Sequence, residues 1–404
     1  MILFAPHRSS IEDGQALDKC AARLPVKAAI SPLVSGAAIP QWWEPLSRSS
    51  CNGSVFLSSA WMQSWLEVYG NDFQGQWIRW EHERETVGGC LLVSRMVWKR
   101  CIPMRSLYLN ATGEVVERAP LAEFNDILHV PGYGEAIAAD FARLVREMAW
   151  DRLLLSGYEE RGVLDRLIPL LPAAQVQREP RPAPYVDMAS LPGKEFLATL
   201  TGKVGNQIRR NVRLHEKEHG EITVTTASSL EQAMQYFREM AILHNARWKS
   251  KGQDGSFASP AVVDFHQRLI RRLWPGQGVD LVCVQGTRSV IGYLYNFLAQ
   301  DKVYFFQSGF AYQDNSKLSP GMLTHSIAIE HYRQRGFREY DMLAGDARYK
   351  RALAKDSRTL HWTVVYRDRT WIRVALSLRA TLARLTSRSS GMEPEGSAAY
   401  SGLD

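Results

Sequence analysis

The sequence lacks several short motifs by which large enzyme classes are recognised. It contains no GxxxxGK[ST], no GxSxG and no GxGxxG pattern. The first pattern binds phosphates in P-loop NTPases, the second carries the serine of α/β-hydrolases, and the third marks dinucleotide-binding enzymes. These absences argue against all three classes.

Cysteine is also scarce. The five cysteines are scattered, without CxxC or Cys/His spacing, which argues against a disulfide framework or a structural zinc site and suits a reducing compartment. No run approaches the ~18 consecutive apolar residues of a membrane span, and the first ten residues hold only a short apolar stretch, so no secretory signal is expected. We expect a cytoplasmic protein that binds no metal.

What the sequence does contain is material for more than one core. The chain has 404 residues, 45% of them hydrophobic, with 12 Trp and 15 Tyr. Because single cores stop growing at roughly 250–300 residues, this length predicts two domains. The formal net charge of +7 is a mild bias, compatible with phosphates, nucleotides or a membrane surface as partners.

The predicted elements occur twice in the same order. Strand-like runs at residues 77–80, 88–97 and 102–109 precede a helix, a strand and another helix. Three hairpin-spaced runs after residue 279 precede a helix over 320–335, a strand, a short helix and a last strand. We therefore expect an α/β (α+β) protein with tandem domains, each a mixed, largely antiparallel sheet flanked by helices.

Composition suggests where these domains begin and end. The first 40 residues show little periodicity, and the Pro-rich stretch 178–188 looks like an extended junction. The predicted division is an extension (1–40), an N-terminal domain (41–188), a C-terminal domain (189–368) and a basic amphipathic helix with a disordered tail (369–404). The amphipathic helix suits either a membrane surface or docking on its own domain.

The segment NSKLSPGML, residues 315–323, predicts a helix start that could bind an anion. Ser319 is a good N-cap, and Gly321 permits close approach of a ligand to the backbone. The amides of Gly321, Met322 and Leu323 would point out of the helix start, where the helix dipole favours anions. Lys317 would add charge. The alternative is an ordinary well-capped helix.

The segment EYDMLAGDARYKRALA, residues 339–354, places polar, basic and aromatic residues after a strand. Asp346 could accept a proton or orient a nucleophile, Lys350 could stabilise an oxyanion, and Tyr349 could contact substrate. The alternative is a surface turn in which Asp346 forms an ion pair with Lys350 or Arg351.

Two further segments could contact a substrate. Arg247 and Trp248 end a predicted helix and could hold an anionic or planar group. Arg210 belongs to a basic helix with Lys203, Arg209, Arg213 and Lys217, which could follow the phosphates of a nucleotide, an RNA or a lipid-linked substrate. The alternatives are a plain surface and a solvated helix face.

Taken together, these segments resemble the CelD-like acyltransferases of the GNAT superfamily, which are associated with bacterial polysaccharide biosynthesis. The matching pieces include IRRNVRLHEKEHG, ARWKSKG, SPG and YDMLAGDARYK, in this order. The similarity spans about residues 55–366 and is specific from Lys203 onwards. The family also resembles the Fem-type aminoacyl transferases, which use two tandem GNAT-like domains.

The resemblance implies transfer of an acyl group from acyl-CoA, most simply acetyl-CoA, to an amine or hydroxyl of a cell-envelope or exopolysaccharide precursor. It places the CoA pyrophosphate at residues 317–323, without the usual arginine- and glycine-rich loop, and Lys350 near the acceptor and the oxyanion. Two alternatives remain open: a Fem-like transferase that uses aminoacyl-tRNA, and a non-catalytic scaffold in a polysaccharide synthesis complex.

Overall fold

The computed structural model describes residues 25–374, apart from residues 35, 37, 100, 101, 192–194, 201, 314, 316 and 317. Most of the predicted tail and C-terminal helix, and the first 24 residues, lie outside this part of the chain. No helix within it is long and apolar enough to cross a membrane.

The N-terminal half contains an antiparallel series of strands followed by one parallel strand. β1 and β2 are paired antiparallel, as are β2 with β3 and β3 with β4. The crossover helix α4 then leads to β6, which pairs parallel with β4. The bounds of the strands are Lys27–Pro32 (β1), Gln74–His82 (β2), Glu85–Lys99 (β3), Ile102–Leu109 (β4), Leu128–His129 (β5) and Arg152–Glu159 (β6). The helices are α2 (Trp43–Ser49), α3 (Ser59–Tyr69), α4 (Gly134–Glu147) and α5 (Val163–Leu167).

The C-terminal half repeats this arrangement. β8, β9, β10 and β11 form an antiparallel series, and the crossover helix α10 leads to β12, which is parallel to β11. The strands are β8 (Ile222–Thr226), β9 (Val279–Gly286), β10 (Val290–Ala299), β11 (Lys302–Phe310) and β12 (Glu339–Asp341). The helices are α6 (Phe196–Thr199), α7 (Gly202–His219), α8 (Leu230–Lys249), α9 (Pro260–Leu273), α10 (Pro320–Gln334) and α11 (Arg348–Leu353). The predicted mixed α/β fold is confirmed, and the two halves share an element order, but β1, within the predicted extension of residues 1–40, and β8 are strands that the sequence pattern did not predict.

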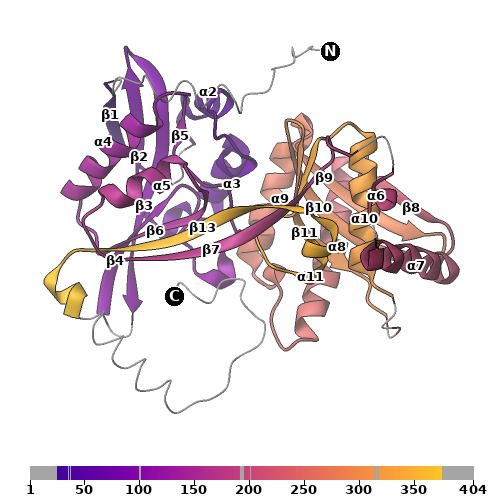
Figure 1. Ribbon diagram of the computed structural model, residues 1–404. Coiled ribbons are helices and arrows are strands. Elements are labelled where there is room, and N and C mark those ends of the chain that lie inside the picture. Colours follow the sequence, from indigo (N-terminus) through magenta and orange to yellow (C-terminus); the bar gives the residue numbers. More distant parts are fainter. Residues whose placement is uncertain are drawn as a thin grey trace.

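The two halves exchange their last strands and thereby share one sheet. β7 (Ala173–Asp187) follows the N-terminal half in sequence but pairs with β12, whereas β13 (Asp356–Arg367) follows the C-terminal half but pairs with β6. β7 and β13 also pair with each other along most of their length. Figure 1 shows these two long strands running between the lobes.

The Pro-rich stretch expected to be a junction is part of β7. Its prolines, Pro180, Pro182 and Pro184, occupy alternate positions, so their missing N–H groups all face the same neighbouring strand. The carbonyls of Pro184 and Pro182 accept the amides of Met342 and Gly345, on the β12 side. The residues between the prolines can therefore bond to β13 without interruption, and the stretch remains a strand despite its composition.

Three large cores fix the helices on the sheet. One core lies between the halves and combines side chains from α2, α3, α8 and α9 with inward faces of both sets of strands. A second core lies under α4 and α5, and a third under α6, α7, α10 and α11. The central core makes the halves one packed unit, because apolar side chains from both contribute to it.

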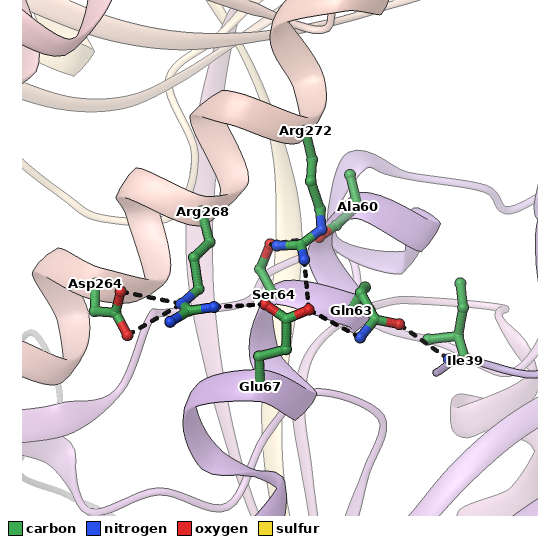
Figure 2. Close-up of polar contacts among 8 residues, drawn as sticks. All are labelled: Ile39, Ala60, Gln63, Ser64, Glu67, Asp264, Arg268 and Arg272. Carbon is green, nitrogen blue, oxygen red and sulfur yellow. Dashed lines mark hydrogen bonds and ion pairs between the residues drawn. The ribbon is translucent and has the colours of Figure 1, made fainter. Parts of the chain in front are cut away.

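Polar contacts join the halves beside that core, where α3 packs against α9. Glu67 of α3 accepts hydrogen bonds from Arg268 (2.7 Å) and Arg272 (2.5 Å) of α9. Gln63 donates to Glu67 at 3.2 Å, and Arg272 also donates to Ser64 at 3.0 Å. Figure 2 shows the carboxylate between the two arginines.

Candidate functional site

The site lies where β11 and β12 separate. Their parallel pairing covers only three residues and ends at Tyr304 and Asp341, while β11 continues to Phe310. Beyond this point, the chain after β12 bonds to β7 instead. A bulge at Phe306, where the register with β10 shifts, increases the local bend of β11. Bulges of this kind are frequent next to active sites.

The start of α10 borders this separation. Gly321 lies against the ring of Phe310, where an added Cβ would be 2.9 Å from a ring carbon. Ser319 occupies the N-cap position but makes no side-chain capping bond, contrary to the expected capping role. The Leu323 amide donates to the Ser319 carbonyl at 3.2 Å, so the amides of Gly321 and Met322 are the ones left at the helix start. Lys317 lies outside the described residues.

An aromatic and basic group lies beside Phe310, the ring that contacts Gly321. The Arg247 guanidinium lies 4.2 Å from the ring centroid of Tyr312, in the loop after β11. Tyr349 stacks on His325 of α10 with 5.0 Å between the ring centroids. Burial and the neighbouring Tyr312 raise the pKa of Tyr349, so it stays protonated at neutral pH. The structure therefore places Arg247 and Tyr349 on the α10 side of the site.

Trp248 and Arg210 are not part of that group. Trp248 lies near His244 and under the ammonium of Lys251, at 5.1 Å from its Nζ. Arg210 is exposed on α7. Arg209 of the same helix donates instead to the backbone of Leu197 and Leu200, so only part of the predicted basic face is free for a ligand.

The side chain of Lys350, in α11, is buried with its ammonium beside the residues that follow β12. Its Nζ donates to the carbonyls of Ala344 at 2.8 Å and Leu343 at 3.1 Å. Glu123, from the N-terminal half, accepts the amide of Ala344 at 2.8 Å. Burial lowers the pKa of Lys350, and the charges of Glu123 and Asp341 partly oppose this. Burial has the opposite effect on the carboxyl of Glu123 and raises its pKa.

Asp341 adds a second buried carboxylate to this group. It is fully buried, and burial raises its pKa to about 7, although Arg358 opposes the shift. Its Oδ1 accepts the Leu343 amide at 2.6 Å, and its Oδ2 lies 3.4 Å from a guanidinium nitrogen of Arg358. Arg358 also donates to Glu339 at 2.7 Å. A carboxyl that titrates near neutral pH can accept or release a proton during a reaction.

Asp346 lies away from these buried groups. Its side chain is exposed and forms an ion pair with Arg351, whose guanidinium also donates to the Asp346 carbonyl at 3.2 Å. The contact corresponds to the surface ion pair that the sequence left open as the alternative. The buried carboxylates near Lys350 are Glu123 and Asp341 instead.

Three residues with strained backbone conformations lie close in sequence to Asp341 or Glu123. Leu343, Leu121 and Phe124 have φ values of 58°, 63° and 48°, in the left-handed region that non-glycine residues rarely adopt. Leu343 follows β12, and the other two flank Glu123. Such conformations each cost about 1–3 kcal/mol and cluster at functional sites. Glu123 itself carried no sequence signal, because only the tertiary structure brings it to Ala344.

The sequence also contains an HExxH pattern, at residues 215–219 of α7, that is typical of zinc enzymes. In the structure His215 and His219 are buried with their rings stacked, whereas Glu216 is exposed. His219 bonds to Ser289 at 2.6 Å. Across the described part of the chain, no three His, Cys, Asp or Glu side chains are grouped to hold a metal ion. The zinc-enzyme geometry is not assembled there.

Comparison with known proteins agrees with this architecture. Residues 202–351 match the family model described as the acetyltransferase (GNAT) domain. The solved structure of FemX aligns with a TM-score of 0.52 and 11% identity, covering 83% of this chain and 96% of that chain. The structure of L-PGS from Bacillus licheniformis aligns with a TM-score of 0.50 and 9% identity, covering 89% of this chain and 99% of that chain. At these identities the likeness shows the fold alone. No curated protein matches the sequence.

The CelD-like subfamily stays a prediction. The coarser expectation is confirmed, since residues 202–351 match a GNAT acetyltransferase domain, which supports a transferase.

Proposed function

We propose that the protein transfers an acyl group from acyl-CoA to an amine or hydroxyl of a cell-envelope or exopolysaccharide precursor. The observation that carries this proposal is the separation of β11 and β12 within the GNAT domain. It is bordered by the start of α10 on one side and by buried Lys350 on the other. We propose that the reaction takes place on the cytoplasmic side of the membrane.

The residues at the start of α10 fit the pyrophosphate of CoA. The amides of Gly321 and Met322 lie at the positive end of the helix dipole, where anions are favoured. The absence of a side chain at Gly321 lets the helix start pack directly on the ring of Phe310. Arg247 adds a cation next to Tyr312. Bound acyl-CoA supplies a thioester, whose acyl carbon the acceptor attacks as the C–S bond breaks.

The buried group supplies charge and a proton acceptor. The ammonium of Lys350 keeps the Leu343–Ala344 carbonyls in place and puts a positive charge beside the end of β12. A positive charge there stabilises negative charge that develops on the acyl oxygen. Asp341, with a pKa of about 7, and Glu123 are the carboxylates able to take the proton that the acceptor loses. The departing thiolate is the final proton acceptor.

Titration calorimetry with acetyl-CoA tests the donor side without knowledge of the acceptor. We expect the full chain to bind acetyl-CoA and Arg247→Ala to bind it about tenfold more weakly, the effect of losing roughly 1.4 kcal/mol. Arg238→Ala is the matched control, because Arg238 is exposed on the same helix. Absence of binding by folded wild-type protein would refute the proposal.

Thiol release from acetyl-CoA in the presence of amino sugars and neutral sugars tests the acceptor side. We expect Lys350→Met to lower turnover at least about 100-fold, as removal of an oxyanion donor does. Asp346→Asn should stay within about threefold of wild type, because Asp346 is exposed and paired with Arg351. Circular dichroism confirms that both variants fold. The opposite ranking would assign the chemistry to Asp346.

A Fem-like transferase that uses aminoacyl-tRNA is the second candidate. The alignment with FemX covers both halves of the chain, and α7 exposes Lys203, Arg210, Arg213 and Lys217. Phosphate contacts through such a face are strongly weakened by salt. Binding of tRNA at low salt that falls steeply with added salt, together with no acetyl-CoA binding, would favour this candidate.

A further inference from the structure

A pocket in the N-terminal half shares no lining residue with the start of α10 and does not include Lys350, although Leu121 and Ala122 in its wall directly precede Glu123. Its volume is about 120 Å³, comparable with cavities of about 150 Å³ that hold benzene. Most of its wall is apolar or aromatic, and two arginines and a glutamate add polar groups. The lining residues used below are Arg95, Tyr108, Glu114, Arg152, Leu154 and Trp362.

Arg152 is the unusual member of this pocket. Its side chain is 2% exposed. The Nε donates to the Ser106 hydroxyl at 2.7 Å, while Nη1 is buried without a hydrogen-bond partner. No described carboxylate lies within ion-pair distance of the guanidinium. Because a buried charge without an opposite charge is costly, the fold retains here a cation that its own residues do not neutralise.

The equivalent position in the other half shows the contrast. Ser106 and Arg152 are the first of three parallel pairs between β4 and β6, as Lys302 and Glu339 are between β11 and β12. There Lys302 lies 3.4 Å from Glu339, and Arg358 lies 2.7 Å from the same carboxylate. The C-terminal half thus neutralises its charges at this register, whereas the N-terminal half does not.

The pocket's own acid does not supply the missing negative charge. Burial raises the pKa of Glu114 to about 8, and the nearby Arg95 and Arg118 only partly oppose this. At neutral pH this side chain is therefore mostly protonated. Its Oε1 is buried without a hydrogen-bond partner, so it too is available to a ligand. The other arginine, Arg95, donates to the Gly113 carbonyl at 3.1 Å.

We propose that this pocket binds a small organic anion, a carboxylate or a phosphate ester attached to an apolar body. The anionic group pairs with the free Nη1 of Arg152, which is the strongest kind of hydrogen bond the pocket offers. The apolar body lies against Tyr108, Leu154 and Trp362. The ligand takes no part in the proposed acyl transfer, so its binding can be tested separately from that reaction.

Calorimetry of the full chain at pH 7 with benzoate, phenyl phosphate and neutral benzamide tests this assignment. We expect at least one anion to bind and benzamide to bind at least about tenfold more weakly, since it cannot form the charged pair. The stronger of the two anions identifies the source as a carboxylate or a phosphate ester. Failure of both anions to bind, or equal binding of benzamide, overturns the proposal.

Variants locate the binding. Arg152→Met should weaken binding of the preferred anion about 10- to 100-fold. An unchanged affinity refutes the site. Ser106→Ala is a small change that removes the hydroxyl orienting the guanidinium, and it should weaken binding of the same anion severalfold. This variant serves as the test if Arg152→Met does not fold. Because the charge is not neutralised, Arg152→Met should keep or raise the urea midpoint. A clearly lower midpoint would show that Arg152 serves folding instead.

Discussion

The buried carboxyl of Asp341 should make stability depend on pH in a way that one isosteric substitution removes. Its pKa is about 7 in the folded protein, against about 3.9 in an unfolded chain. Between these values the folded state holds a proton that the unfolded state has released. Folding stability must therefore fall as pH rises from about 4 to about 7, and this contribution levels off above that.

The magnitude follows from the size of the shift. Each pH unit in that window changes the free energy of unfolding by about 1.4 kcal/mol. Asp341→Asn removes the titration while keeping an acceptor for the Leu343 amide. Relative to the variant, wild-type protein should lose about 2.3 kcal/mol between pH 5 and pH 7, because the slope halves as the pH reaches the folded-state pKa. The charged neighbours Arg358, Glu339, Glu123 and Lys350 are present in both proteins, so their own titrations largely cancel in the difference.

Urea unfolding of both proteins at pH 5, 6, 7 and 8 measures this difference. The stability of wild type relative to the variant should be highest at pH 5 and fall steadily up to pH 7. A difference that stays constant across this range would mean that Asp341 is already ionised at pH 5, held by Arg358. Burial would then not be what sets the pKa of Asp341.

Two further predictions concern packing and the contact between halves. Gly309→Ala should destabilise the protein by more than about 3 kcal/mol, because its Cβ would lie 2.2 Å from the carbonyl oxygen of Met240. Gly276→Ala, with nothing within 4 Å, is the matched control in thermal unfolding and should change little. Glu67→Gln should cost about 1–2 kcal/mol in urea unfolding at low salt and less at high salt, since the partly exposed carboxylate bridges two arginines of α9. Glu147→Gln, a more exposed residue with a longer contact, should change stability by less than about 0.5 kcal/mol; equal effects of the two substitutions would argue against the bridge.

Local pattern was enough to predict the repeated strand and helix order. The strands β2–β4 and β9–β11 alternate or run apolar between clear turns, so their pairing with sequence neighbours follows from hairpin spacing. β7 could not be predicted in the same way. Its Pro-rich composition is typical of a linker. A strand is possible only because the prolines alternate, so that their missing N–H groups all face the very short β12 and the residues between them pair with β13.

The candidate site was predictable only in part, for a similar reason. Lys350 and Tyr349 follow a strand within the GNAT domain, and their segment could be recognised from the sequence. The choice of Asp346 rested on its closeness in sequence, whereas burial and partner charges single out Asp341 and Glu123. Glu123 comes from the other half, and its bond to Ala344 joins residues 221 apart in sequence. No local pattern records such a contact.

The exchange of β7 and β13 also sets an order of events during synthesis. β6 is completed early, yet its neighbour β13 emerges from the ribosome much later, as the 201 residues between Glu160 and His361 indicate. At 5–20 residues per second, translation leaves that strand edge without its partner for about 10–40 s. An unpaired edge is a template for association with other chains. The nascent protein must therefore keep the edge of β6 covered, by a chaperone or by transient contacts of its own, until the last strand is released.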